Sequence, residues 1–98
     1  MIRVILPTYL QRLANVDREI QLDVEGDLTF LELLDVIEGK YPMLKGTIRD
    51  HVTKERRAYL RFFACGEDLS HLTPETLLPG DVLSGKEPFR IVGAMSGG

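Results

Sequence analysis

The chain has 98 residues, of which 44% are hydrophobic and 28% are charged, and its formal net charge is −3. This length fits one domain, and the acidic balance argues against a nucleic-acid-binding surface while it fits a partner with a basic face. A single cysteine, Cys65, excludes an intramolecular disulfide and a ferredoxin-type iron–sulfur cluster, and it favours a reducing, cytoplasmic setting. No apolar run approaches the ~20 residues that span a bilayer, so we expect no membrane partner.

The first part of the chain predicts two strands. Residues 2–6 place Ile2, Val4 and Leu6 on the core side and Ile5 on the opposite side, and Pro7 ends the strand. Residues 8–17 are expected to form a long connection, in which Leu10 and Leu13 pack against the core. Residues 18–24 alternate between apolar and charged side chains, which indicates a second strand and an antiparallel hairpin with the first.

A helix is predicted next, because the period of the apolar residues changes. Five of them follow helical spacing and form one stripe, namely Phe30, Leu33, Leu34, Ile37 and Tyr41. Thr29 and Glu32 form a capping box at the start of the helix. Gly39 and Pro42 are expected to end it.

The second half of the chain predicts two more strands and much irregular structure. Residues 43–57 suggest a short helix or turn that uses Ile48 and Val52. Residues 58–65 form a strand with Phe63 on the side away from the core, and Cys65 is expected to be a buried or half-buried filler. Residues 66–68 form a turn, and Leu69 starts a short edge strand. Residues 70–88 are rich in turn signals, and residues 89–92 form the last strand, with Arg90 and Val92 pointing outward.

These elements predict an α+β fold in which a mixed sheet of four to five strands packs on one main helix. The domain covers residues 1–93. Residues 94–98 are expected to form a flexible tail that ends in Gly97 and Gly98. Because glycine has no Cβ, such a tail can thread a narrow channel.

In this order the elements resemble the ubiquitin-like β-grasp sulfur carriers of the MoaD/ThiS type, which include the small subunit of molybdopterin synthase. The matching pieces cover nearly the whole chain: residues 1–4, 11–14, 31–34, 41–42, 65–68 and the terminal Gly97-Gly98. One departure is the turn before the last strand. Either residues 78–82 form that turn and residues 83–88 are extra, or residues 85–87 take its role after a longer loop.

The resemblance implies a carrier that acts through its C-terminus. A ubiquitin-activating-type enzyme would use ATP-Mg to adenylate Gly98, and sulfur would then displace AMP to give a thiocarboxylate. Gly97 would give the enzyme access to Gly98. A second enzyme, such as the molybdopterin synthase large subunit, would receive the sulfur. The chain has no phosphate-binding loop, so we expect it to bind no cofactor and to be a sulfur-donating subunit rather than a stand-alone enzyme.

Several alternatives stay open. Molybdenum cofactor synthesis is the first choice of pathway, and thiamine or cysteine synthesis is the second. The chain could also be a protein modifier that is joined to a lysine of a target, or an interaction module whose terminal glycines have no role.

Docking to these enzymes requires an apolar area on the sheet face away from the helix. The candidates on the domain are Ile5, Pro7, Phe63, Leu69 and Val92. On the tail, Met95 is expected to pack at the mouth of the partner's channel, and Ser96 is small enough to enter it. We expect no metal site, because His51 and His71 are not spaced with other ligands.

Overall fold

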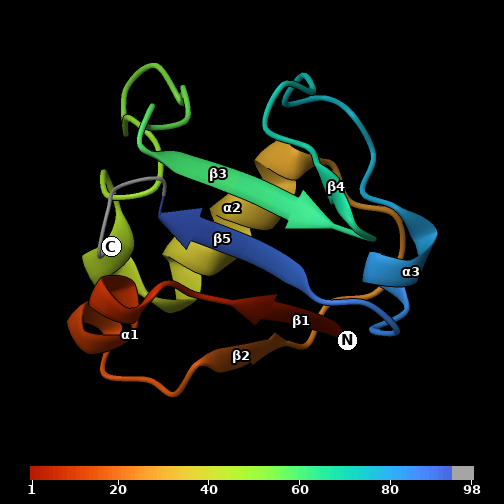
Figure 1. Ribbon diagram of the computed structural model, residues 1–98, viewed down its shortest axis with the longest axis horizontal. Coiled ribbons are helices and arrows are strands. Elements are labelled where there is room, and N and C mark those ends of the chain that lie inside the picture. The colour runs from red at the N-terminus through yellow and green to blue at the C-terminus, as the bar shows by residue number, and fades with distance from the viewer. Residues whose placement is uncertain (94–98) are drawn as a thin grey trace.

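The computed structural model describes residues 1–93, which form a five-stranded sheet with the main helix across one face (Figure 1). The α+β fold that the sequence predicts is confirmed. The strands are β1 (Ile2–Ile5), β2 (Glu19–Leu22), β3 (Leu60–Ala64), β4 (Glu67–Asp68) and β5 (Phe89–Gly93). The helices are α1 (Thr8–Ala14), α2 (Phe30–Lys40), the short 3₁₀ helix η1 (Pro42–Leu44) and α3 (Gly80–Leu83).

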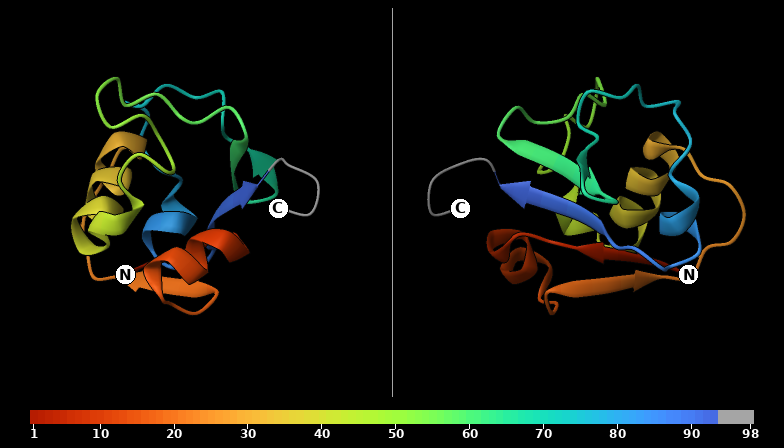
Figure 2. Two further views of the ribbon diagram at one scale, coloured as in Figure 1. Left: turned by 90° about the vertical axis from the view of Figure 1, so that its left-hand side faces the viewer. Right: turned by 45° about the vertical axis from the view of Figure 1, so that its right-hand side comes forward.

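The strands lie in the order β2-β1-β5-β3-β4. The first two form the predicted antiparallel hairpin, and β5 pairs parallel with β1 and antiparallel with β3. The last strand therefore lies at the centre of the sheet. Figure 2 shows α2 on one side of the sheet only, with α1 beyond the end of β1. Across the opposite face, which we call the outer face, no helix of residues 1–93 is packed.

The main helix follows the sequence prediction closely. The Glu32 amide donates to the Thr29 hydroxyl at 3.1 Å, and the Glu32 carboxylate accepts from the Thr29 amide at 3.0 Å. These two bonds satisfy backbone donors that a helix start otherwise leaves free. The helix continues through Gly39 and ends at Lys40, so Gly39 does not end it as expected. Pro42, the other expected stop signal, lies beyond the end of the helix.

Two segments differ from the prediction in the first half and the middle of the chain. Residues 8–14 are helical rather than an open connection. Leu10 and Ala14 are buried, whereas Leu13 is 48% exposed, because residues four apart share a helix face and Leu13 lies off it. Residues 45–57 contain turns, which is one of the two alternatives predicted for residues 43–57, and Ile48 is buried as expected. The difference here is Val52, which is exposed in a turn.

The hairpin between β3 and β4 also differs. Cys65 and Gly66 form its turn with φ values of 54° and 76°, and Glu67 and Asp68 belong to the strand that follows. Two successive residues with positive φ match the tightest hairpin turns. This turn carries the Cys65 side chain to the surface, so the expectation of a buried filler is wrong.

The expected tail, residues 94–98, lies outside the described residues. Between residues 1 and 93, no helix has the length and the apolar character that a membrane crossing requires.

Candidate functional site

One row of residues crosses the outer face from edge to edge. The strand registers align Glu19 with Ile5, Ile5 with Arg90, Arg90 with Phe63, and Phe63 with Asp68. Side chains at aligned positions of neighbouring strands lie on the same face and within reach of one another. Arg90 therefore lies at the centre of the sheet between two apolar side chains, with a carboxylate at each end of the row.

The structure brings four of the predicted docking residues to this face. Val92 is 40% exposed, Phe63 and Pro7 are half-buried, and Ile5 is only 8% exposed although it does not belong to the main core. Docking through them stays a prediction. The alternation in β3 and β5 was sufficient to place Phe63 and Val92 on this side.

Leu69 is a correction, because it packs in the core and not on the outer face. Its amide donates to the carbonyl of Phe62 at 2.7 Å, which sets it opposite an inward-pointing residue of β3. Side chains at opposite positions point to the same face, so Leu69 follows Phe62 toward the helix.

A groove of about 310 Å³ lies where β5 ends. Its apolar residues include Ile5, Pro7 and Val92, and it ends at Gly93, the last described residue. On its polar side Gln11 donates from Nε2 to the carbonyl of Leu6 at 2.7 Å. Five residues follow Gly93 in the sequence, so Gly98 lies at most ~18 Å from it even in a fully extended chain.

The charges on the outer face fall into paired and unpaired groups. Arg3 binds Glu19 at 3.1 Å, and Arg61 binds Asp68 at 2.7 Å. Hydrogen bonding from Ser70 and from Arg61 lowers the pKa of Asp68 to about 2. The guanidinium group of Arg3 likewise lowers the pKa of Glu19. Both carboxylates are therefore charged and engaged at neutral pH.

Arg18 and Arg90 line the groove and form no ion pair with any other residue of the described domain. The groove thus carries positive charge, although the chain as a whole carries a net charge of −3. The expectation of a partner with a basic face came from the total charge, and the groove has the opposite local charge. Arg18 was missed because it precedes β2 in sequence and reaches the groove only through the hairpin.

The remaining predicted site residues, Met95, Ser96, Gly97 and Gly98, lie outside the described residues. Within residues 1–93, no cluster of three or more His, Cys, Asp or Glu side chains could hold a metal ion, and His51 and His71 are exposed.

Comparison with solved structures shows the same fold in several small proteins. SAMP1 from Haloferax volcanii is 22% identical with a TM-score of 0.73, over 99% of this chain and 98% of that chain. The structure of the Amycolatopsis orientalis BexX/CysO complex contains a chain that is 17% identical with a TM-score of 0.74, over 100% of both chains. Urm1 from Sulfolobus solfataricus is 21% identical with a TM-score of 0.62, over 93% of this chain and 97% of that chain.

The identities are low, so these similarities concern the fold: the chain has the ubiquitin-like β-grasp fold that the sequence resemblance implied. No protein-family model and no curated protein sequence gives a significant match to this chain.

Proposed function

We propose that this protein is a ubiquitin-like sulfur carrier that acts through the carboxyl group of Gly98. The observation that carries the proposal is the groove at the end of β5. It combines apolar side chains with Arg18 and Arg90, which form no ion pair within residues 1–93, and it ends at Gly93, five residues before Gly98 in the sequence. A surface of this kind fits a transient partner that takes up the end of the chain.

The chemistry needs a separate activating enzyme, because a carboxylate resists nucleophilic attack. A carboxylate oxygen of Gly98 attacks the α-phosphorus of ATP-Mg, which forms the acyl-adenylate and releases pyrophosphate. A sulfur nucleophile on the activating system then attacks the acyl carbon, and AMP leaves. When this nucleophile is hydrosulfide, loss of its proton leaves a thiocarboxylate on Gly98. When it is a protein persulfide, a thiol attacks the S–S bond and is oxidised to a disulfide with the donor, and the outer sulfur stays on Gly98 as the thiocarboxylate. A second enzyme consumes this sulfur and returns the carboxylate.

The protein's own contribution is placement. The sheet fixes Gly93, and the ~18 Å limit on the following residues defines how far the partner's active site can lie from the groove. Gly97 and Gly98 have no side chains, which lets them enter a narrow channel. Ser96 is small enough to follow, and Met95 would pack at the channel mouth.

The partners would dock on the outer face through Ile5, Pro7, Phe63 and Val92. Arg18 and Arg90 have no ion-pair partner in the described part of the chain, and they favour a partner surface with an apolar centre and carboxylates at its rim. The solved structure of the BexX/CysO complex, which contains a chain of the same fold, supports binding of a carrier of this shape by a partner protein. The family resemblance favours molybdopterin synthesis as the receiving pathway, with the molybdopterin synthase large subunit as receiver; thiamine and cysteine synthesis are the alternatives.

A second candidate is a protein modifier, and the similarity in fold to small archaeal modifier protein 1 (SAMP1) favours it. In this case a lysine amine of a target attacks the activated Gly98, and an isopeptide bond replaces the thiocarboxylate. Both candidates share the adenylation step and differ in the nucleophile.

Intact mass spectrometry separates the two. The purified protein is first weighed to establish that Gly98 is its last residue, and it is then incubated with an adenylating enzyme, ATP-Mg and a sulfur donor. A carrier exchanges one oxygen for sulfur, and the change is absent when Gly98 is deleted. A modifier instead adds its whole mass to a second protein. An unchanged mass in every reaction, with formation of the adenylate also absent, would overturn the proposal.

A further inference from the structure

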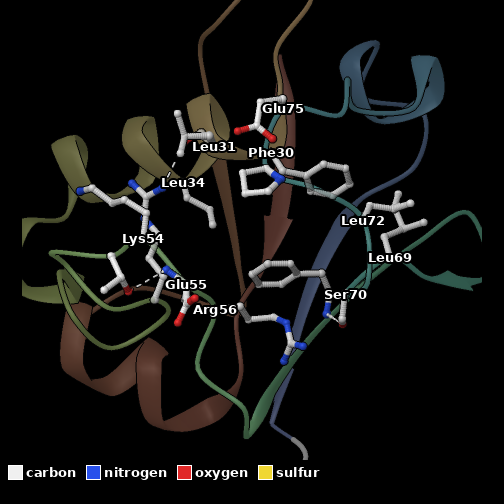
Figure 3. Close-up of a pocket in the computed structure, with 14 residues that line it drawn as sticks. Phe30, Leu31, Leu34, Lys54, Glu55, Arg56, Leu69, Ser70, Leu72 and Glu75 are labelled. Atoms are coloured by element: carbon white, nitrogen blue, oxygen red, sulfur yellow. Dashed lines mark hydrogen bonds between the residues drawn. The ribbon is translucent and has the colours of Figure 1, made fainter.

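The groove at the end of β5 differs in charge from a larger cavity on the helix side of the sheet. The charged side chains that line this cavity, of about 460 Å³, have both signs; they are Arg49, Lys54, Glu55, Arg56 and Glu75 (Figure 3). Among the described residues that line the groove, Arg18 and Arg90 are the charged ones, and both are positive. The groove therefore favours an anion, whereas the cavity has no such preference.

The two arginines of the groove are available to an anion. Glu19 directly follows Arg18 in the sequence, but its carboxylate accepts from Arg3 at 3.1 Å. The residues aligned with Arg90 on β1 and β3 are apolar. Neither Arg18 nor Arg90 forms an ion pair within residues 1–93, and both side chains are exposed. An anion that enters the groove can therefore bind both guanidinium groups.

The chain itself brings an anion close to the groove. The groove ends at Gly93, and the proposed function places a free α-carboxyl group on Gly98, five residues further along the sequence. The ordinary pKa of an α-carboxyl group is about 3.5, so this group is charged at neutral pH. Because a short tether holds it near the groove, its effective concentration there is on the order of millimolar.

The residues after Gly93 are sufficient in number to return to Arg90. Arg90 lies three residues before Gly93 on β5, which is a distance of about 10 Å. A β-turn takes four residues, here 93–96, and reverses the chain. Residues 97 and 98 would then cover about 7 Å back along the outer face, and the long side chain of Arg90 spans the remaining gap.

We propose that the free protein holds its own C-terminus in the groove, with the Gly98 carboxylate bound by Arg18 and Arg90. This inference rests on the proposed function for one premise, namely that Gly98 carries a free carboxyl group. The contact is weak, because exposed ion pairs contribute little and the tail loses conformational entropy when it is ordered. A partner can therefore displace the tail.

This contact would couple docking to release of the C-terminus. The proposed partner covers the outer face and has carboxylates at its rim, and these compete with Gly98 for the same two arginines. A partner that binds there frees Gly98 next to its own channel. A protein that lacks carboxylates at these positions leaves Gly98 in the groove, which adds selectivity before activation.

The single cysteine allows a direct test of where the tail lies. Cys65 is exposed in the turn after β3, at the end of that strand remote from Gly93. A tail that extends away from the sheet places Gly98 about 35 Å from Cys65, and a tail folded back onto Arg90 places it about 10 Å away. A nitroxide attached to Cys65 broadens the NMR signals of nearby amides, and the broadening falls steeply with distance. In the ¹⁵N-labelled full chain we expect strong broadening at Gly97 and Gly98.

A double variant tests the two arginines. Arg18→Gln/Arg90→Gln removes both positive charges of the groove and should lose most of the broadening at Gly98. Lys54→Gln/Lys86→Gln removes two positive charges from exposed residues that do not line the groove, and it should keep the broadening. Since all four side chains are exposed, we expect both double variants to fold.

Carboxyl-carbon NMR titration of Gly98 tests the contact itself. A cation next to a carboxyl group favours its charged form, so the pKa of Gly98 should be lower by about 0.5 in the unmodified protein than in Arg18→Gln/Arg90→Gln. The pKa in Lys54→Gln/Lys86→Gln should equal that of the unmodified protein. The intact mass of each sample first establishes that Gly98 is its last residue.

Three results would overturn the proposal: no broadening at Gly98 in the unmodified protein, equal broadening in Arg18→Gln/Arg90→Gln, or equal pKa values in these two proteins. A mixture tests whether the tail of a second copy occupies the groove. If a nitroxide-labelled chain broadens Gly98 of a separate ¹⁵N-labelled Cys65→Ser chain as strongly as it broadens its own, the contact is intermolecular and the proposal is wrong. These measurements use no partner enzyme, so their outcome is separate from that of the sulfur exchange at Gly98.

Discussion

The two faces of the sheet are built from the same strands but carry different kinds of residues. On the inner face the side chains are apolar and almost fully buried against α2; they are Ile2, Val4, Ile20, Leu22, Leu60, Phe62, Phe89 and Ile91. On the outer face arginines and carboxylates alternate with a few apolar side chains. The difference is clearest in β5, where Phe89 and Ile91 are buried and Arg90 and Val92 are exposed.

With docking on the outer face, as proposed, residues for folding and residues for recognition alternate along each strand. Successive side chains of a strand point to opposite faces, so neighbours in the sequence belong to different environments. Substitutions on the inner face are therefore expected to change folding, and substitutions on the outer face to change binding.

The largest expected effect is Phe89→Ala. Phe89 is fully buried between Phe30 and Phe62, and removal of its ring leaves a cavity that the neighbours cannot fill. We expect a loss of about 3–5 kcal/mol in the free energy of unfolding, measured by urea denaturation. Arg90→Ala, one residue along, is the control and should change it by less than about 0.5 kcal/mol. Equal losses in both variants would contradict the division between the faces.

Glu38→Ala should have the next largest effect. Arg49 and Glu38 are both buried and joined at 3.0 Å, so removal of the carboxylate leaves a buried charge that depends on the exposed Asp35 alone. We expect the free energy of unfolding, measured by urea denaturation, to fall by about 3 kcal/mol, with Glu25→Ala as an exposed control. If Glu38→Ala lowers the free energy of unfolding no more than the control does, this ion pair does not stabilise the fold as described.

Val92→Asp tests the outer face. Val92 is exposed, so the free energy of unfolding should change by less than about 0.5 kcal/mol. Binding to the activating enzyme should weaken about tenfold or more in calorimetry, because a carboxylate then stands at the apolar part of the groove. Val52→Asp introduces the same charge at an exposed site outside the groove and should leave binding unchanged. Equal binding by the two variants would rule out docking at Val92.

The smallest effect expected is electrostatic and concerns Asp68. Hydrogen bonding with Ser70 is the largest cause of its low pKa, and Arg61 adds to it. Because the pKa is lower in the folded protein than its ordinary value of 3.8, Asp68 stabilises the fold above that pH, and the contribution is lost as the pH falls toward about 2.

Carboxyl-carbon NMR titration measures this pKa directly. Ser70→Ala and Arg61→Gln should each raise the midpoint for Asp68 toward 3.8, with the larger rise in Ser70→Ala. A midpoint already near 3.8 in the unmodified protein would show that these contacts do not hold the carboxylate.

The sequence was sufficient for the parts of the fold with a clear period. The apolar stripe and the capping box located α2, and alternation assigned the two sides of β3 and β5. It was insufficient for α1, because Leu10 and Leu13 alone do not reveal which helix face is buried. It also misplaced Leu69, whose side depends on the hairpin register after Cys65 and Gly66.

The groove could not be predicted from the sequence because it joins distant segments. Arg18 and Arg90 line the same groove only after β1 pairs with both β2 and β5. Arg56 likewise donates to the carbonyl of Leu60 at the free edge of β3, and no local pattern encodes that contact. Residues with predictable positions thus lie within regular elements, and those that were missed depend on how the elements assemble.

The most direct test of the central claim combines the outer face with the chemistry at Gly98. The unmodified protein, Val92→Asp and Val52→Asp are each incubated with the activating enzyme, ATP-Mg and a sulfur donor, and the fraction with one oxygen replaced by sulfur is measured by intact mass. We predict rapid conversion of the unmodified protein and of Val52→Asp, and much slower conversion of Val92→Asp at a limiting enzyme concentration. Absence of sulfur from all three, or equal rates in all three, would contradict the account.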